Sequence, residues 1–180
     1  MYKRQVLEQA IQDIAKFVGP DTVILSVLNG ITSEEHIDAA YPGHTLWSVA
    51  IGMDATRTGR TLVFNQAGKI QFGERSGEMT DRVQAVADLF DGTGLHYQTT
   101  VHIREEIWSK FRLNVCNNLP QAILGAGVGC YRDSVHMQAI SDGLRRELEA
   151  IAAAKGIDLS LVDSAVSYGS LVKPTARYST

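Results

Sequence analysis

The spacing of hydrophobic residues changes once along this chain, near Thr100, and this change limits the folds that the chain can adopt. Before Thr100, short apolar runs rich in β-branched residues alternate with helical patterns and glycines, which is typical of an α/β sheet unit. After Thr100, apolar residues recur at the helical period in two long segments, 102–124 and 134–155. The sequence therefore predicts an α/β domain over residues 1–99 and an all-helical domain over residues 100–180.

The first unit begins with a helical pattern that leads into a strongly apolar run. Apolar side chains recur at helical spacing across residues 6–18 as one buried stripe, and Gly19-Pro20-Asp21 ends the pattern. Residues 22–28, TVILSVL, are apolar almost throughout, as in a parallel strand that is covered on both faces. Because a helix, a turn and a buried strand form the later half of a β-α-β unit, we expect the earlier strands of this sheet to precede the chain.

Further short strands and one helix complete the predicted sheet unit. Glycines separate three strand patterns, at 47–51, 61–64 and 69–72, and a fourth strand is expected at 95–98. A helix is predicted over 78–90, with Met79 among its inward residues. In the second long helix of the helical unit, the predicted buried stripe consists of Ile140, Leu144, Leu148 and Ile151.

Charge and composition argue against several classes of function. The formal net charge is -3, with acidic and basic residues interleaved, so we predict no nucleic-acid partner. No apolar run approaches the roughly 20 residues that span a bilayer, and no signal peptide is recognisable, so we predict a cytoplasmic location without membrane association. The histidines and the two cysteines lack metal-ligand spacing, and no G-x-S-x-G elbow is present, so we predict neither a metal site nor a serine hydrolase.

One helix carries the residues that are best suited to chemistry. In residues 108–119, WSKFRLNVCNNL, the spacing places Lys110, Asn114 and Asn118 in one line that overlaps the apolar flank of the helix. A buried ammonium and two buried amides cost free energy unless each finds a partner, which favours a cleft that binds a polar ligand. The alternative is that Lys110 extends to water while both asparagines bond to nearby backbone. The residues alone leave both interpretations open.

Asn29 and Gly30 directly follow the apolar run at 22–28. Ligands of open parallel sheets lie in the crevice outside the carboxyl ends of the strands, which favours a binding role for Asn29. An Asn-Gly pair is also an ordinary turn, because both residues tolerate left-handed backbone geometry. Position rather than residue type therefore makes this pair a candidate.

The order of these features resembles that of the ketopantoate reductase (2-dehydropantoate 2-reductase) family. The features are an Asn-Gly pair after a late strand, glycine-rich strands, and W-x-K-x-x-x-N-x-x-x-N at the start of a helical domain. The resemblance extends from VLEQAIQDIAKFVGPDTVILSVLNGITSEE to RRELEAIAAAKGI, which is nearly the whole chain. It implies part of a Rossmann-type parallel-sheet domain that binds NADP, followed by a helical domain like the C-terminal domain of 6-phosphogluconate dehydrogenase.

The resemblance also implies roles for individual residues. Lys110 matches the general acid that contacts the substrate and protonates its ketone oxygen, and Asn114 and Asn118 match substrate-binding asparagines. Asn29 and Gly30 match residues that lie against NADPH. The glycine-rich G-x-G-x-x-G loop, the basic residue for the NADPH 2′-phosphate, and a later serine and glutamate of the family have no counterpart in these 180 residues. We therefore expect the chain alone to bind NADPH weakly and to be inactive.

The function that the resemblance implies is reduction of 2-dehydropantoate to pantoate with NADPH, in the biosynthesis of pantothenate and coenzyme A. The expected partner is this small-molecule substrate, and the resemblance is compatible with a homodimer. Two alternatives stay open: a related dehydrogenase that acts on another 2-keto or 3-hydroxy acid, and a non-catalytic binding domain derived from the same fold.

Overall fold

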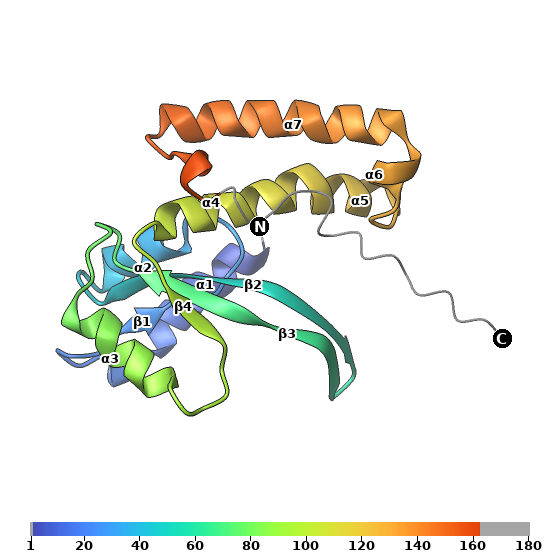
Figure 1. Ribbon diagram of the computed structural model, residues 1–180. Helices are drawn as coiled ribbons and strands as arrows, with labels where there is room; N and C mark the ends of the chain where they lie inside the picture. The colour runs from blue at the N-terminus through green and yellow to red at the C-terminus, as the bar shows by residue number, and fades with distance from the viewer. Residues whose placement is uncertain (1, 163–180) are drawn as a thin grey trace.

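In the computed structural model, which describes residues 2–162, a four-stranded sheet is followed by a layer of helices (Figure 1). The strand order is β1 (Ile24–Leu25), β2 (Thr45–Thr58), β3 (Thr61–Gly73) and β4 (Tyr97–Thr99). The outer pairs β1–β2 and β3–β4 are parallel, whereas β2 and β3 are antiparallel. The predicted fold class, a partial Rossmann-type domain followed by a helical domain, is confirmed. The sheet is nevertheless mixed rather than purely parallel.

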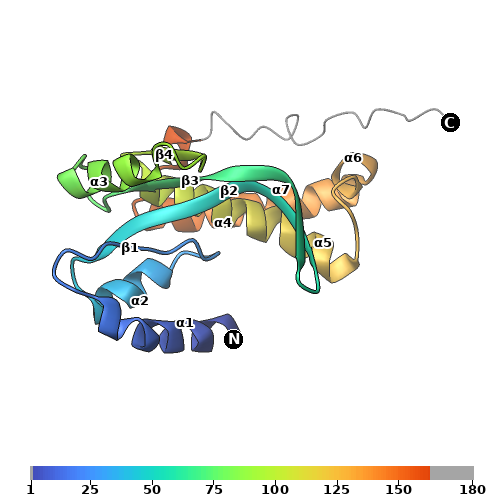
Figure 2. The ribbon, with the colours of Figure 1, turned by 90° about the horizontal axis from the view of Figure 1, so that it is seen from below.

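The central strands form one long hairpin in place of the three short strands predicted at 47–51, 61–64 and 69–72. The glycines that seemed to end these strands lie within the hairpin or at its turn. Gly68 has a φ of 67°, and a Cβ at this position would stand 2.3 Å from the backbone oxygen of Ile51. Glycine therefore allows the two strands to approach closely and continue, and the hairpin extends well beyond helix α3 (Asp81–Phe90) (Figures 1 and 2).

The segment before the hairpin differs from the prediction in two respects. The strand expected at 22–28 covers only Ile24–Leu25, and Val27 and Leu28 are exposed. Within the described residues β1 pairs only with β2, so the backbone leaves the sheet soon after Leu25. Helix α2 (Ser33–Ala40), which we did not predict, then leads to β2.

The expected helix at 6–18 is divided into α1 (Tyr2–Asp13) and a 3-10 turn, η1 (Ala15–Phe17). Its predicted buried stripe is wrong, because Val6 and Phe17 are both exposed. Within the described residues α1 packs mainly against α2, so this helix has little neighbouring structure to cover its apolar side chains.

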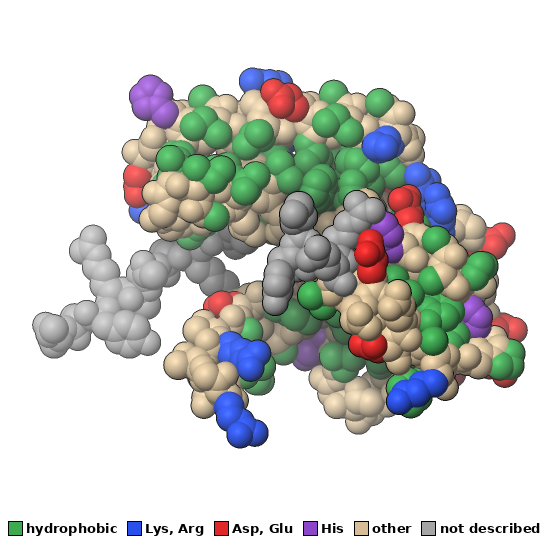
Figure 3. All heavy atoms as spheres, turned by 180° about the vertical axis from the view of Figure 1, so that it is seen from behind, with side chains coloured by type: hydrophobic (Ala, Val, Ile, Leu, Met, Phe, Trp, Pro, Cys, Tyr) green, Lys and Arg blue, Asp and Glu red, His purple; other side chains and the backbone are tan. Residues whose placement is uncertain are grey.

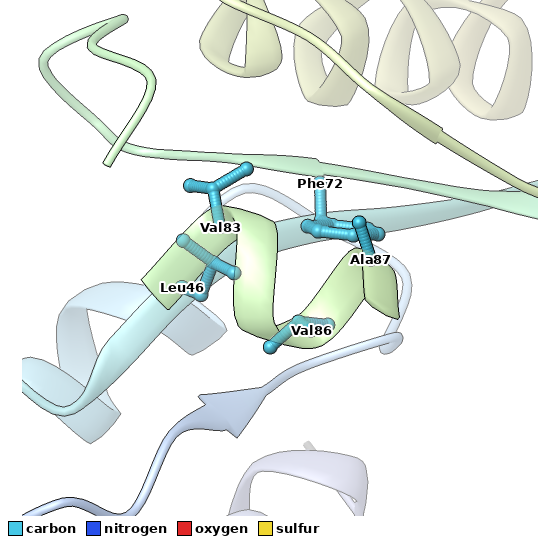
Figure 4. Packing of buried hydrophobic residues seen from close by; sticks show 5 residues of the cluster. All are labelled: Leu46, Phe72, Val83, Val86 and Ala87. Atoms are coloured by element: carbon cyan, nitrogen blue, oxygen red, sulfur yellow. The ribbon is translucent and has the colours of Figure 1, made fainter. Parts of the chain in front are cut away.

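Alternate residues of β2 and β3 face two different helices. On one face, Leu46 and Phe72 pack against α3, whose inward residues are Val83, Val86 and Ala87 (Figure 4). On the other face, Trp47 and Val49 pack against Ile103 and Ile107 of α4 (Ile103–Leu113). Met79, predicted to be inward, is exposed because α3 begins only at Asp81.

The helical layer continues α4 through a π-helical turn, η2 (Asn114–Asn118), into α5 (Leu119–Leu124). After the short helix α6 (Cys130–Asp133), α7 (Val135–Ala154) runs back alongside them, and the 3-10 turn η3 (Leu159–Leu161) returns to α4 (Figure 1). The Ser134 hydroxyl caps α7 by accepting a hydrogen bond from the Met137 N–H. The predicted long helices at 102–124 and 134–155 thus correspond to α4–η2–α5 and to α7.

The buried face of α7 differs from the predicted stripe. Leu148 is buried as expected, but Ile140 and Ile151 are exposed, and the other buried residues are Met137, Ser141 and Ala152. The small side chains of Ser141 and Ala152 allow α7 to pack closely, which a count of large apolar residues does not reveal. Figure 3 accordingly shows many hydrophobic side chains at the surface of the helical layer. The division into domains at residues 99 and 100 stays a prediction.

Candidate active site

Helix α4 lies between the sheet and α7, and this arrangement fixes the direction of each of its faces. Ile103 and Ile107 pack on the sheet, whereas Trp108 packs against Leu148 of α7. Acidic residues in its first turn and basic residues, including Lys110, in its last turn both interact favourably with the helix dipole. Because Ile107 packs on the sheet, the Lys110 side chain, about one turn later on α4, also starts close to the sheet.

The ammonium of Lys110 donates a hydrogen bond to the backbone oxygen of Ala50 in β2. The side chain is half-buried, and loss of water around the charged group lowers the pKa of Lys110 from its ordinary value. Lys110 thus does not extend freely into water, which was the alternative left open by the sequence.

The oxygen that Lys110 contacts lies on an open edge of the sheet. Ala50 is opposite Ile70, and the Ile70 N–H donates to His96, away from β2. In an antiparallel pair, the backbone N–H and C=O groups of two opposed residues either bond to each other or both point away from the partner strand. The backbone oxygen of Ala50 therefore points away from β3. That edge of β2 is the one that pairs with β1, and β1 has already ended opposite Leu46. Lys110 therefore lies just beyond the carboxyl end of β1.

Asn29 and Gly30 follow the same end of β1. Asn29 is exposed, and Gly30 has a φ of 115° with no atom within 4 Å of the place where a Cβ would stand. The next residue, Ile31, packs against both hydrophobic clusters that include α4, so this loop is held beside the Lys110 helix. Open space beside Gly30 and an exposed amide at Asn29 suit the approach of a flat, polar ring such as nicotinamide.

The asparagines Asn114 and Asn118 lie in the π-helical turn, a type of irregularity that is frequent at functional sites. The Asn118 amide donates to the Asn114 side-chain oxygen over 2.9 Å. Asn114 is half-buried, but Asn118 is exposed, so the expectation that all three polar residues point inward is wrong for Asn118. Asn118 is the last residue of the π turn, whose wider winding changes the direction of its side chains relative to a regular α-helix.

Among the three asparagines of this turn, Asn117 is the buried one, whereas regular helical spacing had favoured Asn118. The hydroxyl of Tyr131, from α6, donates to the Asn117 backbone oxygen over 2.6 Å. This contact fixes the end of η2 against the following helices. The structure thus brings Lys110 to the sheet side of α4, with the Asn29–Gly30 loop nearby, and places Asn114 one turn further along with Asn118 bonded to it.

A second polar contact between the sheet and α4 was also missed. Gln71 of β3 is only 2% exposed, and its amide donates to the carboxyl oxygen of Glu106 over 2.9 Å. Burial raises the pKa of Glu106, although the bond from Gln71 lowers it in part. A glutamine in the middle of the apolar run KIQFG was the sequence signal for this contact.

Within residues 2–162, no group of three or more His, Cys, Asp or Glu side chains is placed to hold a metal ion. No helix in the same part of the chain combines the length and the apolar character needed to cross a bilayer.

Sequence comparison identifies two family models and several relatives. The model "Ketopantoate reductase PanE/ApbA" matches residues 1–77, and "Ketopantoate reductase PanE/ApbA C terminal" matches residues 102–175. The chain is 26% identical over 170 residues to a 2-dehydropantoate 2-reductase of Streptococcus pyogenes, covering 88% of this chain and 52% of the relative. The chain thus spans about half the length of this relative.

Solved structures give the same picture of the fold. A 2-dehydropantoate 2-reductase of Geobacter metallireducens superposes with a TM-score of 0.77 at 22% identity, covering 93% of this chain and 55% of that one. A D-mandelate dehydrogenase solved with NADH gives a TM-score of 0.73 at 23% identity, covering 86% of this chain and 52% of that one. At these identities the likeness concerns the fold alone.

Proposed function

The chain belongs to the ketopantoate reductase family, whose named relatives are oxidoreductases, and we propose on this basis that it reduces 2-dehydropantoate to pantoate with NADPH. The product serves the synthesis of pantothenate and coenzyme A. The observation that carries the proposal is the half-buried ammonium of Lys110, which lies at the open edge of β2 just beyond the carboxyl end of β1. Ligands of open α/β sheets bind at such strand ends.

Lys110 is the proposed general acid. Its ammonium donates a hydrogen bond to the ketone oxygen, stabilises the negative charge that develops there, and then transfers a proton to it. In the unliganded protein the Ala50 carbonyl occupies this donor, and the substrate oxygen replaces that carbonyl on binding. The lowered pKa of Lys110 favours transfer of the proton.

The remaining residues bind and orient. Asn114 and Asn118 are proposed to hold the carboxylate or hydroxyl groups of the substrate, since an amide both donates and accepts hydrogen bonds. Asn29 and the open backbone at Gly30 are proposed to hold the nicotinamide end of NADPH. When bound, that cofactor would supply the hydride to the keto carbon.

The test compares wild type with Lys110→Ala in the protein expressed from the complete reading frame that contains this chain. With 2-dehydropantoate, we expect the variant to lower the kcat for NADPH oxidation by about 10²- to 10⁴-fold, the usual contribution of general acid catalysis. The matched control is Lys155→Ala, which removes an exposed lysine at the end of α7. Unchanged turnover in Lys110→Ala, with folding preserved, would remove Lys110 from the mechanism.

The same assay separates the alternatives. The D-mandelate dehydrogenase fold supports a relative that acts on another 2-keto acid, so phenylglyoxylate and NADH are tested beside 2-dehydropantoate and NADPH. A preference for phenylglyoxylate would favour the related dehydrogenase, and absence of turnover with every pair would favour a non-catalytic binding domain. A homodimer and a cytoplasmic location also stay predictions, to be tested by light scattering and by cell fractionation.

A further inference from the structure

Gln71 and Glu106 join the sheet to α4, and neither takes part in the proposed chemistry. We propose that they form a positioning pair, which holds α4 at a fixed place over β2 and thereby keeps the Lys110 ammonium beside the substrate oxygen. This inference rests on the proposed role of Lys110.

The pair lies at the centre of a small polar network. Gln71 is opposite Val49 in the hairpin, on the face that α4 covers. Besides the bond to Glu106, its amide donates to the Gln98 side-chain oxygen of β4 over 3.4 Å, and Lys69 donates to the same oxygen. Two strands therefore contribute to the contact with α4.

The helix transmits this contact to the site. Glu106 and Lys110 are four residues apart on α4 and so lie one above the other along the helix. Between them, Ile107 packs on the sheet through apolar contacts, which have no preferred direction and tolerate sliding. A hydrogen bond depends on both distance and angle, so the bond between Gln71 and Glu106 can fix the position of the helix where apolar contacts cannot.

Stability alone does not account for the pair. Both groups lose water on folding, and the side-chain oxygen of Gln71 is buried without a partner among the described residues. Apolar residues of similar size would pack there without this cost. A positioning role explains why two strands and a helix nevertheless meet through polar groups.

The pair matters most when a ligand is bound. Without ligand, the bond from Lys110 to Ala50 also holds α4 to the sheet. Once the ammonium turns to a substrate oxygen, that bond is lost, and the bond from Gln71 to Glu106 is the directional contact that remains between α4 and the hairpin in the described residues.

The experiment uses the protein from its complete reading frame with three variants. Glu106→Gln keeps an oxygen that can accept from Gln71, whereas Glu106→Leu and Gln71→Met remove the hydrogen bond and keep the volume. Glu105→Gln and Glu105→Leu are matched controls one residue away on the same helix. Lysines are labelled by reductive ¹³C-methylation, and the Lys110 resonance is assigned by its loss in Lys110→Arg.

We expect the pKa of Lys110 to rise toward the ordinary lysine value in Glu106→Leu and Gln71→Met, because a displaced helix exposes the ammonium. The kcat falls roughly 10- to 100-fold in the same two variants, as for a small misplacement of a catalytic group, with the KM for NADPH unchanged. Glu106→Gln and both Glu105 variants retain the wild-type pKa and kcat.

A wild-type Lys110 pKa and kcat in Gln71→Met, which removes the bond from the sheet side, would overturn the positioning role even if Glu106→Leu fails to fold. A loss of kcat in Glu106→Gln as large as in Glu106→Leu would overturn it too. The proposed general acid can fail separately, if Lys110→Ala retains full turnover. If Gln71→Met still raises the pKa of Lys110 in that case, the positioning pair stands although the catalytic role of Lys110 does not.

Discussion

Truncation of Ile107 to alanine tests the packing on which the whole site depends. Ile107 is 3% exposed and lies between α4 and the Trp47 and Val49 side chains of β2. Isoleucine-to-alanine changes in cores cost about 2–5 kcal/mol, the cost rising with the cavity that remains. The rigid Trp47 ring limits collapse around the gap, so we expect about 3–4 kcal/mol here, and about 1 kcal/mol for Ile107→Val.

Urea unfolding followed by circular dichroism and tryptophan fluorescence measures this cost. At an m-value of roughly 2 kcal/mol/M, the midpoint for Ile107→Ala falls by about 1.5–2 M. The control is Ile151→Ala on α7, where the side chain is 53% exposed and the cost is about 0.5 kcal/mol or less. Equal midpoints for Ile107→Ala and Ile151→Ala would refute the packing of α4 on the sheet and, with it, the position assigned to Lys110.

Two further predictions concern the hairpin and a buried carboxyl. Gly68→Ala should destabilise the fold by about 2 kcal/mol or more, because a Cβ there would meet the Ile51 backbone oxygen at 2.3 Å. Gly59→Ala, also at positive φ but with open space around it, should cost about 1–2 kcal/mol. Thermal melting measures both costs. Burial raises the pKa of Glu34, so its stabilising contribution is complete below the unfolded pKa and is lost as pH rises through the folded one. Glu34→Gln should therefore gain stability over wild type as pH rises from about 4 to about 8, and a constant difference would contradict this.

Much of the fold could be predicted because periodicity reports which elements are present. The two long helices and α3 were predicted within a few residues of their observed bounds. Periodicity does not report the angle at which a helix meets its neighbours. Ile151 was therefore predicted to be on the buried face of α7, although Ala152 is the buried residue. Pairing between strands was also out of reach, because a glycine such as Gly68 has the same local pattern whether it ends a strand or bends one.

The site could be predicted only in part for a similar reason. The position of Lys110 followed from regular helical spacing, and the structure places its ammonium on the sheet side of α4, with Asn114 half-buried one turn later. The exposure of Asn118 could not be predicted, because the π turn that contains it has no clear signature in local sequence. Gln71 and Glu106 meet only through the tertiary fold, 35 residues apart in the chain, so no motif could have joined them.

The π turn makes the number of residues between Trp108 and Pro120 matter as well as their identity. Loss of a single codon in this stretch would allow a regular α-helical hydrogen-bond pattern, except at Pro120, which has no N–H. The same loss would turn α5 by about 100° and draw it back by about 1.5 Å relative to α4. We therefore expect this stretch to tolerate neither insertion nor deletion, even one that leaves Lys110 and Asn114 in place.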